Sequence, residues 1–87
     1  MHILDVRSKR EFEAGHVPGA RHVPFWAAFT RARRVIRSPD APVTVYCGHG
    51  PRAWIAKALL RTAGYTHVRL LKGHMRAWIK SGQRVER

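Results

Sequence analysis

The short run Val43-Thr44-Val45-Tyr46 constrains the fold more than any other part of this 87-residue sequence. It contains no charged residue, and residues 38–42 before it have the proline and aspartate content of a connecting loop. A continuous run of this length is typical of a central strand in a parallel sheet, which is buried on both faces. A short polar loop follows, and residues 53–63 then show the spacing of an amphipathic helix.

Segments on either side repeat this alternation of strand and helix. Ser8 and Glu11 have the spacing of a capping box, so a helix of about two turns should start there, and Gly15 should end it in a left-handed conformation. The whole pattern predicts strands at residues 3–6, 43–46 and 68–71, an extended piece at 21–23, and further helices at 26–36, 53–63 and 75–80. Such alternation indicates an α/β fold, with one parallel-sheet domain over residues 1–87.

The apolar residues of two predicted helices indicate which sides should face the core. The helix predicted at 26–36 has an apolar stripe that starts just before it, at spacings of four, three and four residues. The stripe consists of Phe25, Phe29, Ala32 and Ile36. In the helix at 53–63, the residues expected to face inward are Ile55, Ala56, Leu59, Leu60 and Ala63.

Cys47, the only cysteine, stands where the central strand ends and the polar loop begins. Carboxyl ends of strands are where parallel sheets bind ligands. The N–H groups of the loop would form a ring with Cys47 at its mouth. Together with the positive end of the following helix dipole, they would favour the anionic form of the sulfur. A lone cysteine forms no internal disulfide, so we expect a reducing compartment, the cytoplasm.

The net charge of +12, from 17 Lys and Arg against 5 Asp and Glu, creates a strong positive field. It would attract small oxyanions, acidic proteins or nucleic acid. The arginines of the helix at 26–36 and just after it either form a basic stripe or are an ordinary solvated face: Arg31, Arg33, Arg34 and Arg37.

Other classes of function are disfavoured by what the sequence lacks. No stretch of 18 apolar residues occurs, and the first residues lack the pattern of a signal peptide, so we expect a soluble protein that is neither exported nor membrane-bound. The six histidines show no paired ligand spacing, and there is no second cysteine. We therefore expect no metal site and no cofactor.

Several short motifs occur in a characteristic order along the chain. They are Leu4-Asp5-Val6-Arg7 with Glu11-Phe12, Gly15-His16-Val17-Pro18-Gly19-Ala20 with Pro24, Val45-Tyr46-Cys47 with Gly50 and Arg52-Ala53, Ala63-Gly64-Tyr65, and Gly73 with Trp78. Together they resemble a single rhodanese (sulfurtransferase) domain over residues 4–85. The resemblance implies a parallel α/β domain with helices on both faces of the sheet.

This resemblance implies that the Cys47 thiolate takes sulfur from a small anionic donor such as thiosulfate and becomes a persulfide. The persulfide would then pass the sulfur to cyanide or a thiol. The active-site loop would comprise Gly48, His49, Gly50, Pro51, Arg52 and Ala53, supported by Asp5, Arg7 and His74. Arg52 would pair with Asp5 or contact the donor. The alternative is a non-catalytic or sulfur-relay module that docks an acidic protein or RNA through its basic surface.

Loop length favours sulfur transfer over phosphate chemistry. Four residues separate Cys47 from Arg52, as in rhodaneses, whereas the related Cdc25-type phosphatases have one more. Within the loop, Pro51 removes one N–H donor, and His49 either adds charge beside the sulfur or is an exposed polar residue.

Three further features depart from the family pattern or have two readings. The chain is N-terminally short, so one sheet edge should be bare and available for a homodimer or a fused partner. His74 stands where a second glycine is common, and would narrow or charge the pocket rim or cap the last helix. Trp54 would wall the pocket or pack in the core, and Trp78 fits a core position.

Overall fold

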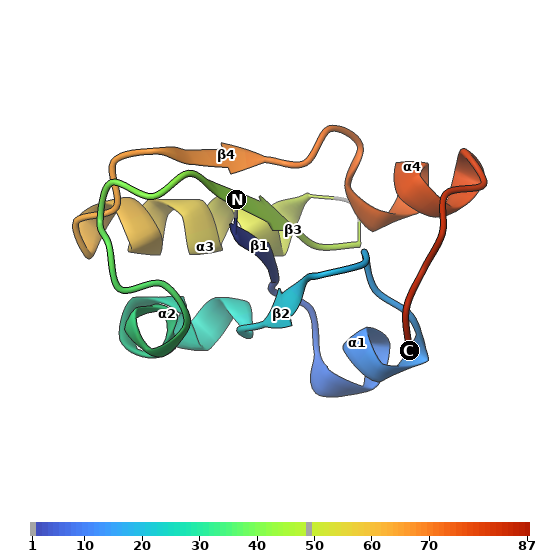
Figure 1. The fold of residues 1–87 in the computed structure, drawn as a ribbon, viewed down its shortest axis with the longest axis horizontal. Helices are drawn as coiled ribbons and strands as arrows, with labels where there is room; N and C mark the ends of the chain where they lie inside the picture. Colours follow the sequence, from blue (N-terminus) through green and yellow to red (C-terminus); the bar gives the residue numbers. More distant parts are fainter. Residues whose placement is uncertain (1, 49) are drawn as a thin grey trace.

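The computed structural model describes residues 2–48 and 50–87 and contains alternating strands and helices (Figure 1). His49 and Met1 lie outside the described residues. In chain order the elements are β1 (His2–Asp5), α1 (Lys9–Ala14), β2 (Arg21–His22), the 3₁₀ turn η1 (Phe25–Ala27), α2 (Ala28–Val35), β3 (Val43–Tyr46), α3 (Pro51–Thr62), β4 (Val68–Leu70) and α4 (His74–Lys80).

The described strands form one parallel sheet in the order β2-β1-β3-β4. As predicted, β3 is central, and all four of its residues are buried. Within the described residues, no strand pairs with the outer edge of β4. The predicted α/β class and the parallel sheet are therefore confirmed.

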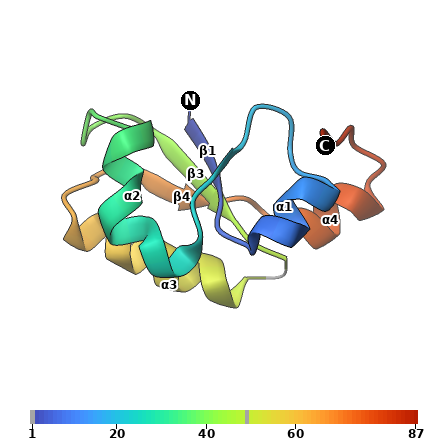
Figure 2. The ribbon, with the colours of Figure 1, turned by 90° about the horizontal axis from the view of Figure 1, so that it is seen from below.

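Helices cover both faces of the sheet, and each face has its own apolar cluster (Figure 2). Val45 and Tyr46 are neighbours in β3 and point to opposite faces, as strand geometry requires. On the Val45 side, α2 and α3 pack against the sheet through small residues and Leu60. On the Tyr46 side lie Phe12 of α1 and residues of α4. Cys47 belongs to the Val45 side.

The predicted apolar stripes are partly wrong. Phe29 is 47% exposed and Ile55 is 49% exposed, whereas Ala28 is fully buried. The first residues of the predicted helix form the 3₁₀ turn η1, which has three residues per turn and therefore shifts the phase of the helix that follows. Most of the buried residues that α2 and α3 contribute to this cluster are alanines, and because alanine is small, the two helices can approach closely. The buried residues are Ala28, Ala32, Ala53, Ala56 and Leu60, with Ile36 directly after α2.

The ends of two helices show how local sequence sets the backbone. The capping box at Ser8 and Glu11 is present as predicted. Gly15 ends α1 as predicted, with a positive φ that side chains disfavour, but its φ of 155° and ψ of 134° lie outside the left-handed helical region that was expected. Helix α3 begins at Pro51, two residues earlier than predicted, since proline at the first helical position has no N–H that needs a partner.

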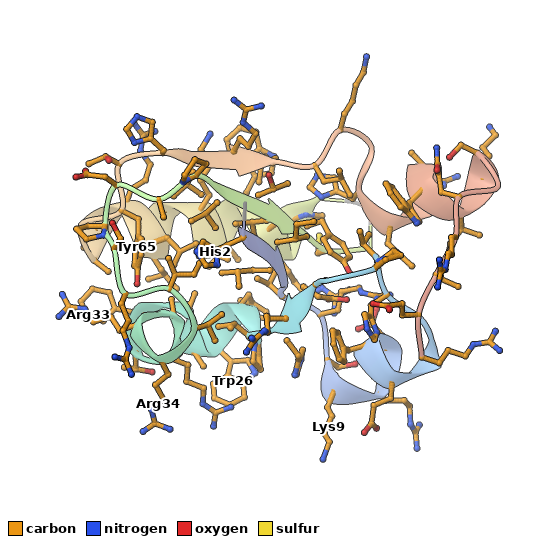
Figure 3. All side chains as sticks on the ribbon, in the orientation of Figure 1. His2, Lys9, Trp26, Arg33, Arg34 and Tyr65 are labelled. Atoms are coloured by element: carbon orange, nitrogen blue, oxygen red, sulfur yellow. The ribbon has the colours of Figure 1, made fainter. Side chains whose placement is uncertain are left out.

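The surface carries many basic groups and a few large apolar ones. Arg34 points away from α2 into solvent, and Arg33, also exposed, donates to the Ala63 carbonyl (Figure 3). Trp54 is 62% exposed, so the prediction that it packs in the core is wrong, whereas a place for it beside a pocket at Cys47 stays a prediction. Trp78 is partly buried against the Tyr46-side cluster, as expected. None of the helices in the described part of the chain is long and apolar enough to cross a membrane.

Candidate active site

The loop after β3 connects the central strand to the first turn of α3. Cys47 directly follows β3, and Gly50 is the N-cap of α3 with φ 135°, a backbone conformation that side chains disfavour. Gly48 lies between them, and the prediction for His49 falls outside the described residues. The strand, loop and helix are thus arranged as predicted.

The sulfur of Cys47 receives a hydrogen bond from the loop. The Gly50 N–H donates to Cys47 Sγ at 2.9 Å, so this amide points inward. The side chain of Cys47, however, is fully buried, because it continues the buried strand and packs on the Val45 side of the sheet. The side chain of Cys47 is therefore part of the Val45-side core, and the expectation that it lies at the mouth of the loop is wrong.

Helix α3 places further positive partial charge behind the loop. N–H groups in the first turn of a helix have no acceptor within the helix, and here that turn includes Arg52 and Ala53. The aligned peptide dipoles of this 12-residue helix add positive potential at the same end. Pro51 supplies no N–H, so in this stretch the N–H donors belong to Gly50, Arg52 and Ala53, and the Gly50 N–H is the one that donates to the sulfur.

The start of α4 holds the first half of the loop. The Met75 N–H donates to the Cys47 carbonyl, and the Arg76 N–H donates to the Gly48 carbonyl, both at 3.0 Å. His74 Nδ1 accepts a hydrogen bond from the Cys47 N–H at 3.3 Å. His74 is buried and its ring is turned toward Cys47. The N-cap of α4 is Gly73, with no side-chain cap hydrogen bond, so the expectation that His74 caps this helix is wrong.

Arg52 forms an ion pair with Glu11 of α1, not with Asp5. Its NH1 and NH2 groups donate to the two carboxylate oxygens of Glu11 at 2.6 and 3.0 Å. The expected pairing of Arg52 with Asp5 is therefore wrong. Glu11 also accepts from the Ser8 N–H, so one carboxylate both caps α1 and ties α1 to the Cys47 loop. The sequence predicts Glu11 as a capping residue and as part of the Glu11-Phe12 motif, but not as the partner of Arg52.

We expect this ion pair to make stability depend on pH. The hydrogen bond from Arg52 lowers the pKa of Glu11 from its usual 4.5 to about 2. A carboxylate with a lowered pKa in the folded state contributes stability above its unfolded pKa and loses it as the pH falls through the folded pKa. Glu11→Gln should therefore be less stable than the wild type at pH 7, with the difference shrinking between pH 4.5 and 2.

Urea unfolding at a series of pH values measures this difference. Glu13→Gln is the matched control, because Glu13 is an exposed acid on the same helix. If the difference in the free energy of unfolding between the wild type and Glu11→Gln stays constant from pH 7 to pH 2, the ion pair contributes nothing to stability.

Asp5 and Arg7 form a separate, buried network at the end of β1. The Asp5 carboxylate accepts hydrogen bonds from the Arg7 side chain and from the Tyr46 hydroxyl, the shortest at 2.6 Å. Arg7 also donates to the Gly15 carbonyl. The Tyr46 hydroxyl oxygen in turn accepts a hydrogen bond from the Val17 N–H. Desolvation raises the pKa of Tyr46, with the charge of Asp5 adding to the effect, so the hydroxyl stays protonated and can donate. The network joins β1, β3 and the connection after α1.

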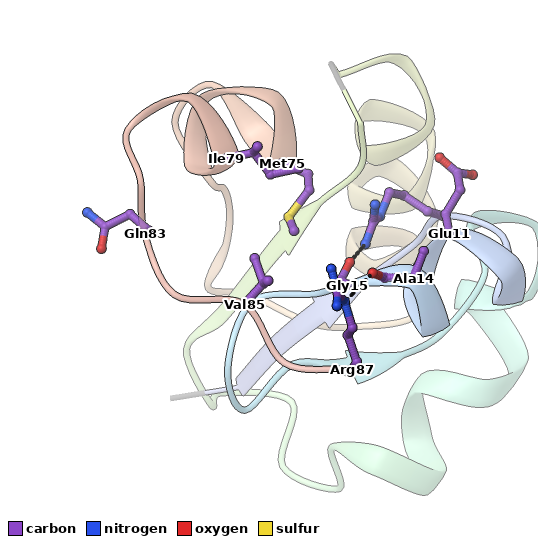
Figure 4. A pocket seen from close by; sticks show the side chains of 9 residues that line it. Glu11, Ala14, Gly15, Met75, Ile79, Gln83, Val85 and Arg87 are labelled. Atoms are coloured by element: carbon purple, nitrogen blue, oxygen red, sulfur yellow. Dashed lines mark hydrogen bonds between the residues drawn. The ribbon is translucent and has the colours of Figure 1, made fainter.

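A cavity of about 360 Å³ lies between α1, α4 and the last residues (Figure 4). Its lining residues are Arg7, Glu11, Ala14, Gly15, Met75, Ile79, Gln83, Val85 and Arg87. The cavity borders the Tyr46-side cluster, whereas Cys47 packs on the Val45 side. It is therefore next to the ion pairs but does not open onto the sulfur.

In residues 2–48 and 50–87, no group of three or more His, Cys, Asp or Glu side chains is arranged to hold a metal ion.

A family model described as "Rhodanese-like domain" matches residues 1–81. Thiosulfate sulfurtransferase GlpE of Pseudomonas fluorescens is 37% identical over 78 residues, and the uncharacterized protein YqhL of Bacillus subtilis is 38% identical over 76 residues. Each match covers 87% of this chain, but 68% of GlpE and 59% of YqhL.

A solved structure resembles the whole chain. The Rhodanese_3-like domain of the Alr3790 protein from Anabaena superposes with a TM-score of 0.91 at 33% sequence identity. The match covers 100% of this chain and 99% of that domain.

Proposed function

Because the chain belongs to the rhodanese-like domain family, we propose that it is a sulfurtransferase that carries a sulfane sulfur as a persulfide on Cys47. The observation that carries the proposal is the hydrogen bond from the Gly50 N–H to Cys47 Sγ at 2.9 Å. Donors that already point at a sulfur anion stabilise it without reorganisation during the reaction. The name of the relative GlpE, a thiosulfate sulfurtransferase, supports the same chemistry.

The reaction proceeds in two transfers. In the first, the Cys47 thiolate attacks the outer sulfur of a donor such as thiosulfate, an S–S bond forms to Cys47, and sulfite leaves with the electron pair of the broken S–S bond. In the second, cyanide or a thiolate attacks the terminal sulfur, and Cys47 leaves again as a thiolate. No external oxidant or reductant is needed, and the thiol must stay reduced between cycles, as it does in the cytoplasm.

Loop length supports a small anionic sulfur donor over a phosphate ester, because four residues separate Cys47 from Arg52, one fewer than in Cdc25-type phosphatases. Arg52 is held by Glu11 in a two-point ion pair, so the loop must bind an anion mainly through backbone groups. The Gly50 N–H and the first turn of α3 provide the positive potential that an anionic donor needs. The net charge of +12 speeds the encounter of such a donor with the protein.

The complete burial of Cys47 favours a second candidate function. A buried thiol suits a rhodanese-like module that carries sulfur only when a partner opens the loop, or that does not react at all. The partner would be an acidic protein or an RNA docked on the basic surface. Alternatively, a second copy of this chain would pair with the outer edge of β4 and form a homodimer.

Mass spectrometry of the intact protein after incubation with thiosulfate distinguishes the two functions. A sulfurtransferase should gain about 32 Da, the mass of one sulfur atom, on Cys47, and cyanide should remove it again. Sulfate is the matched control, because it has the same charge but no sulfane sulfur. If the protein gains no mass from thiosulfate over hours at neutral pH, the proposal is wrong and the docking function is favoured.

A further inference from the structure

His74 has a backbone conformation that histidine rarely adopts. Its φ is 56°, and among the described residues it is the one non-glycine residue with positive φ. The preceding Gly73 is also left-handed, with φ 72°. A β-carbon disfavours this region, and residues held in it cluster at functional sites. The position therefore needs an explanation in terms of what the side chain does.

The ring of His74 reaches both ends of the hydrogen bond that holds the sulfur. Nδ1 accepts the N–H of Cys47, the residue that carries Sγ. On the other side of the ring, a β-carbon placed on Gly50 would lie 3.6 Å from Nε2, so the ring lies beside Gly50 and faces the side on which a β-carbon would project. Gly50 is the residue whose N–H donates to Sγ.

The hydrogen bond also fixes the state of the imidazole. Since the Cys47 N–H is a donor, Nδ1 must present its lone pair, and the neutral ring then carries its proton on Nε2. The same left-handed turn starts α4 where the Met75 and Arg76 amides meet the carbonyls of Cys47 and Gly48. One unfavourable backbone conformation thus places three hydrogen bonds on the first half of the loop.

We propose that His74 is a positioning residue for sulfur transfer: it fixes Cys47 through Nδ1 and supports Gly50 with its ring, so that the Gly50 amide stays aimed at the sulfur. This inference rests on the proposed function. It assigns His74 no contact with the donor or acceptor. A purely structural role would predict instead that sulfur transfer follows protein stability alone.

Two substitutions separate these roles. His74→Gly keeps the left-handed backbone, which glycine adopts freely, but removes the acceptor and the ring. His74→Asn keeps an acceptor oxygen near the position of Nδ1, and asparagine tolerates the left-handed region better than most residues. His67→Asn is the matched control, because His67 is an exposed histidine before β4, outside the loop.

Each protein is tested by its thermal midpoint, its rate of sulfur gain from thiosulfate and its rate of Cys47 alkylation by iodoacetamide. We expect His74→Gly to fold and to gain sulfur about fivefold to tenfold more slowly at saturating thiosulfate, the loss of about one hydrogen bond. Its Cys47 should be alkylated faster, because the loop is less restrained. His74→Asn should recover most of the sulfuration rate and the slow alkylation.

The outcomes are distinct. If folded His74→Gly gains sulfur and is alkylated at wild-type rates, or if His74→Asn is as impaired as His74→Gly, the positioning role is wrong. If the wild type gains no sulfur, the proposed function fails, and alkylation alone then decides whether His74 fixes the loop. Should His74→Gly not fold, a wild-type sulfuration rate in His74→Asn supports the role, and a tenfold loss in this folded variant contradicts it.

Discussion

Replacing Cys47 with serine should abolish sulfur gain from thiosulfate and leave the fold unchanged. Serine has nearly the shape of cysteine, and its hydroxyl can accept the Gly50 N–H in place of Sγ. The hydroxyl is not ionised at neutral pH and is a weak nucleophile, so no persulfide or equivalent species forms. We expect thiosulfate:cyanide turnover to fall to the background rate without protein.

Circular dichroism and thermal melting provide the control for this substitution. The free energy of unfolding should change by no more than about 1 kcal/mol, because one buried hydrogen bond replaces another. Since Cys47 is the only cysteine, no second thiol can substitute for it. Turnover that persists in a folded Cys47→Ser protein would mean that the sulfur is carried elsewhere and would sink the catalytic assignment.

The sheet could be predicted from sequence because its signals are local. Val43-Thr44-Val45-Tyr46 forms β3 as predicted, since a run without charges is stable only where both faces are covered. Ser8 and Glu11 start α1 as predicted, because a capping box needs only residues three apart. Both features depend on neighbours in the chain.

The phases of the helices could not be predicted in the same way. The stripe through Phe29 assumes 3.6 residues per turn from Phe25 onward, but the helical segment begins with a 3₁₀ turn at Phe25. Ile55 lies one position from the buried Ala56, and the close approach of α2 and α3 favours the smaller side chain at the contact. Size complementarity between two helices is not visible in the pattern of either one.

The candidate site shows the same division. The order of strand, cysteine loop and helix follows from local pattern, but the partner of Arg52 comes from α1, 41 residues earlier. Pairing Asp5 with Arg7 does not identify Glu11 as the partner of Arg52, because Glu13, Asp40 and Glu86 also remain in the sequence. For His74 the signal was its place directly after Gly73, where a left-handed backbone is common, but its bond to Cys47 required the packing of α4 on the loop.

Replacing Arg7 with methionine should cause the largest loss of stability among the substitutions considered for this chain. Asp5 is fully buried, and Arg7 provides three of the hydrogen bonds that its carboxylate accepts from side chains. Methionine has a similar length but leaves the carboxylate with the Tyr46 hydroxyl and the backbone N–H of residue 7. Removing one partner of a buried ion pair typically costs about 3–5 kcal/mol.

A double-mutant cycle shows whether the cost comes from the orphaned charge. Asp5→Asn removes that charge while retaining a group that can pair with the Tyr46 hydroxyl, so adding it to Arg7→Met should restore part of the lost free energy of unfolding. Urea denaturation of the wild type, both single variants and the double variant at pH 7 gives the coupling. If the two losses simply add, the buried pair is not a unit, and the loss in Arg7→Met must come from packing over Tyr46 and from the bond to the Gly15 carbonyl.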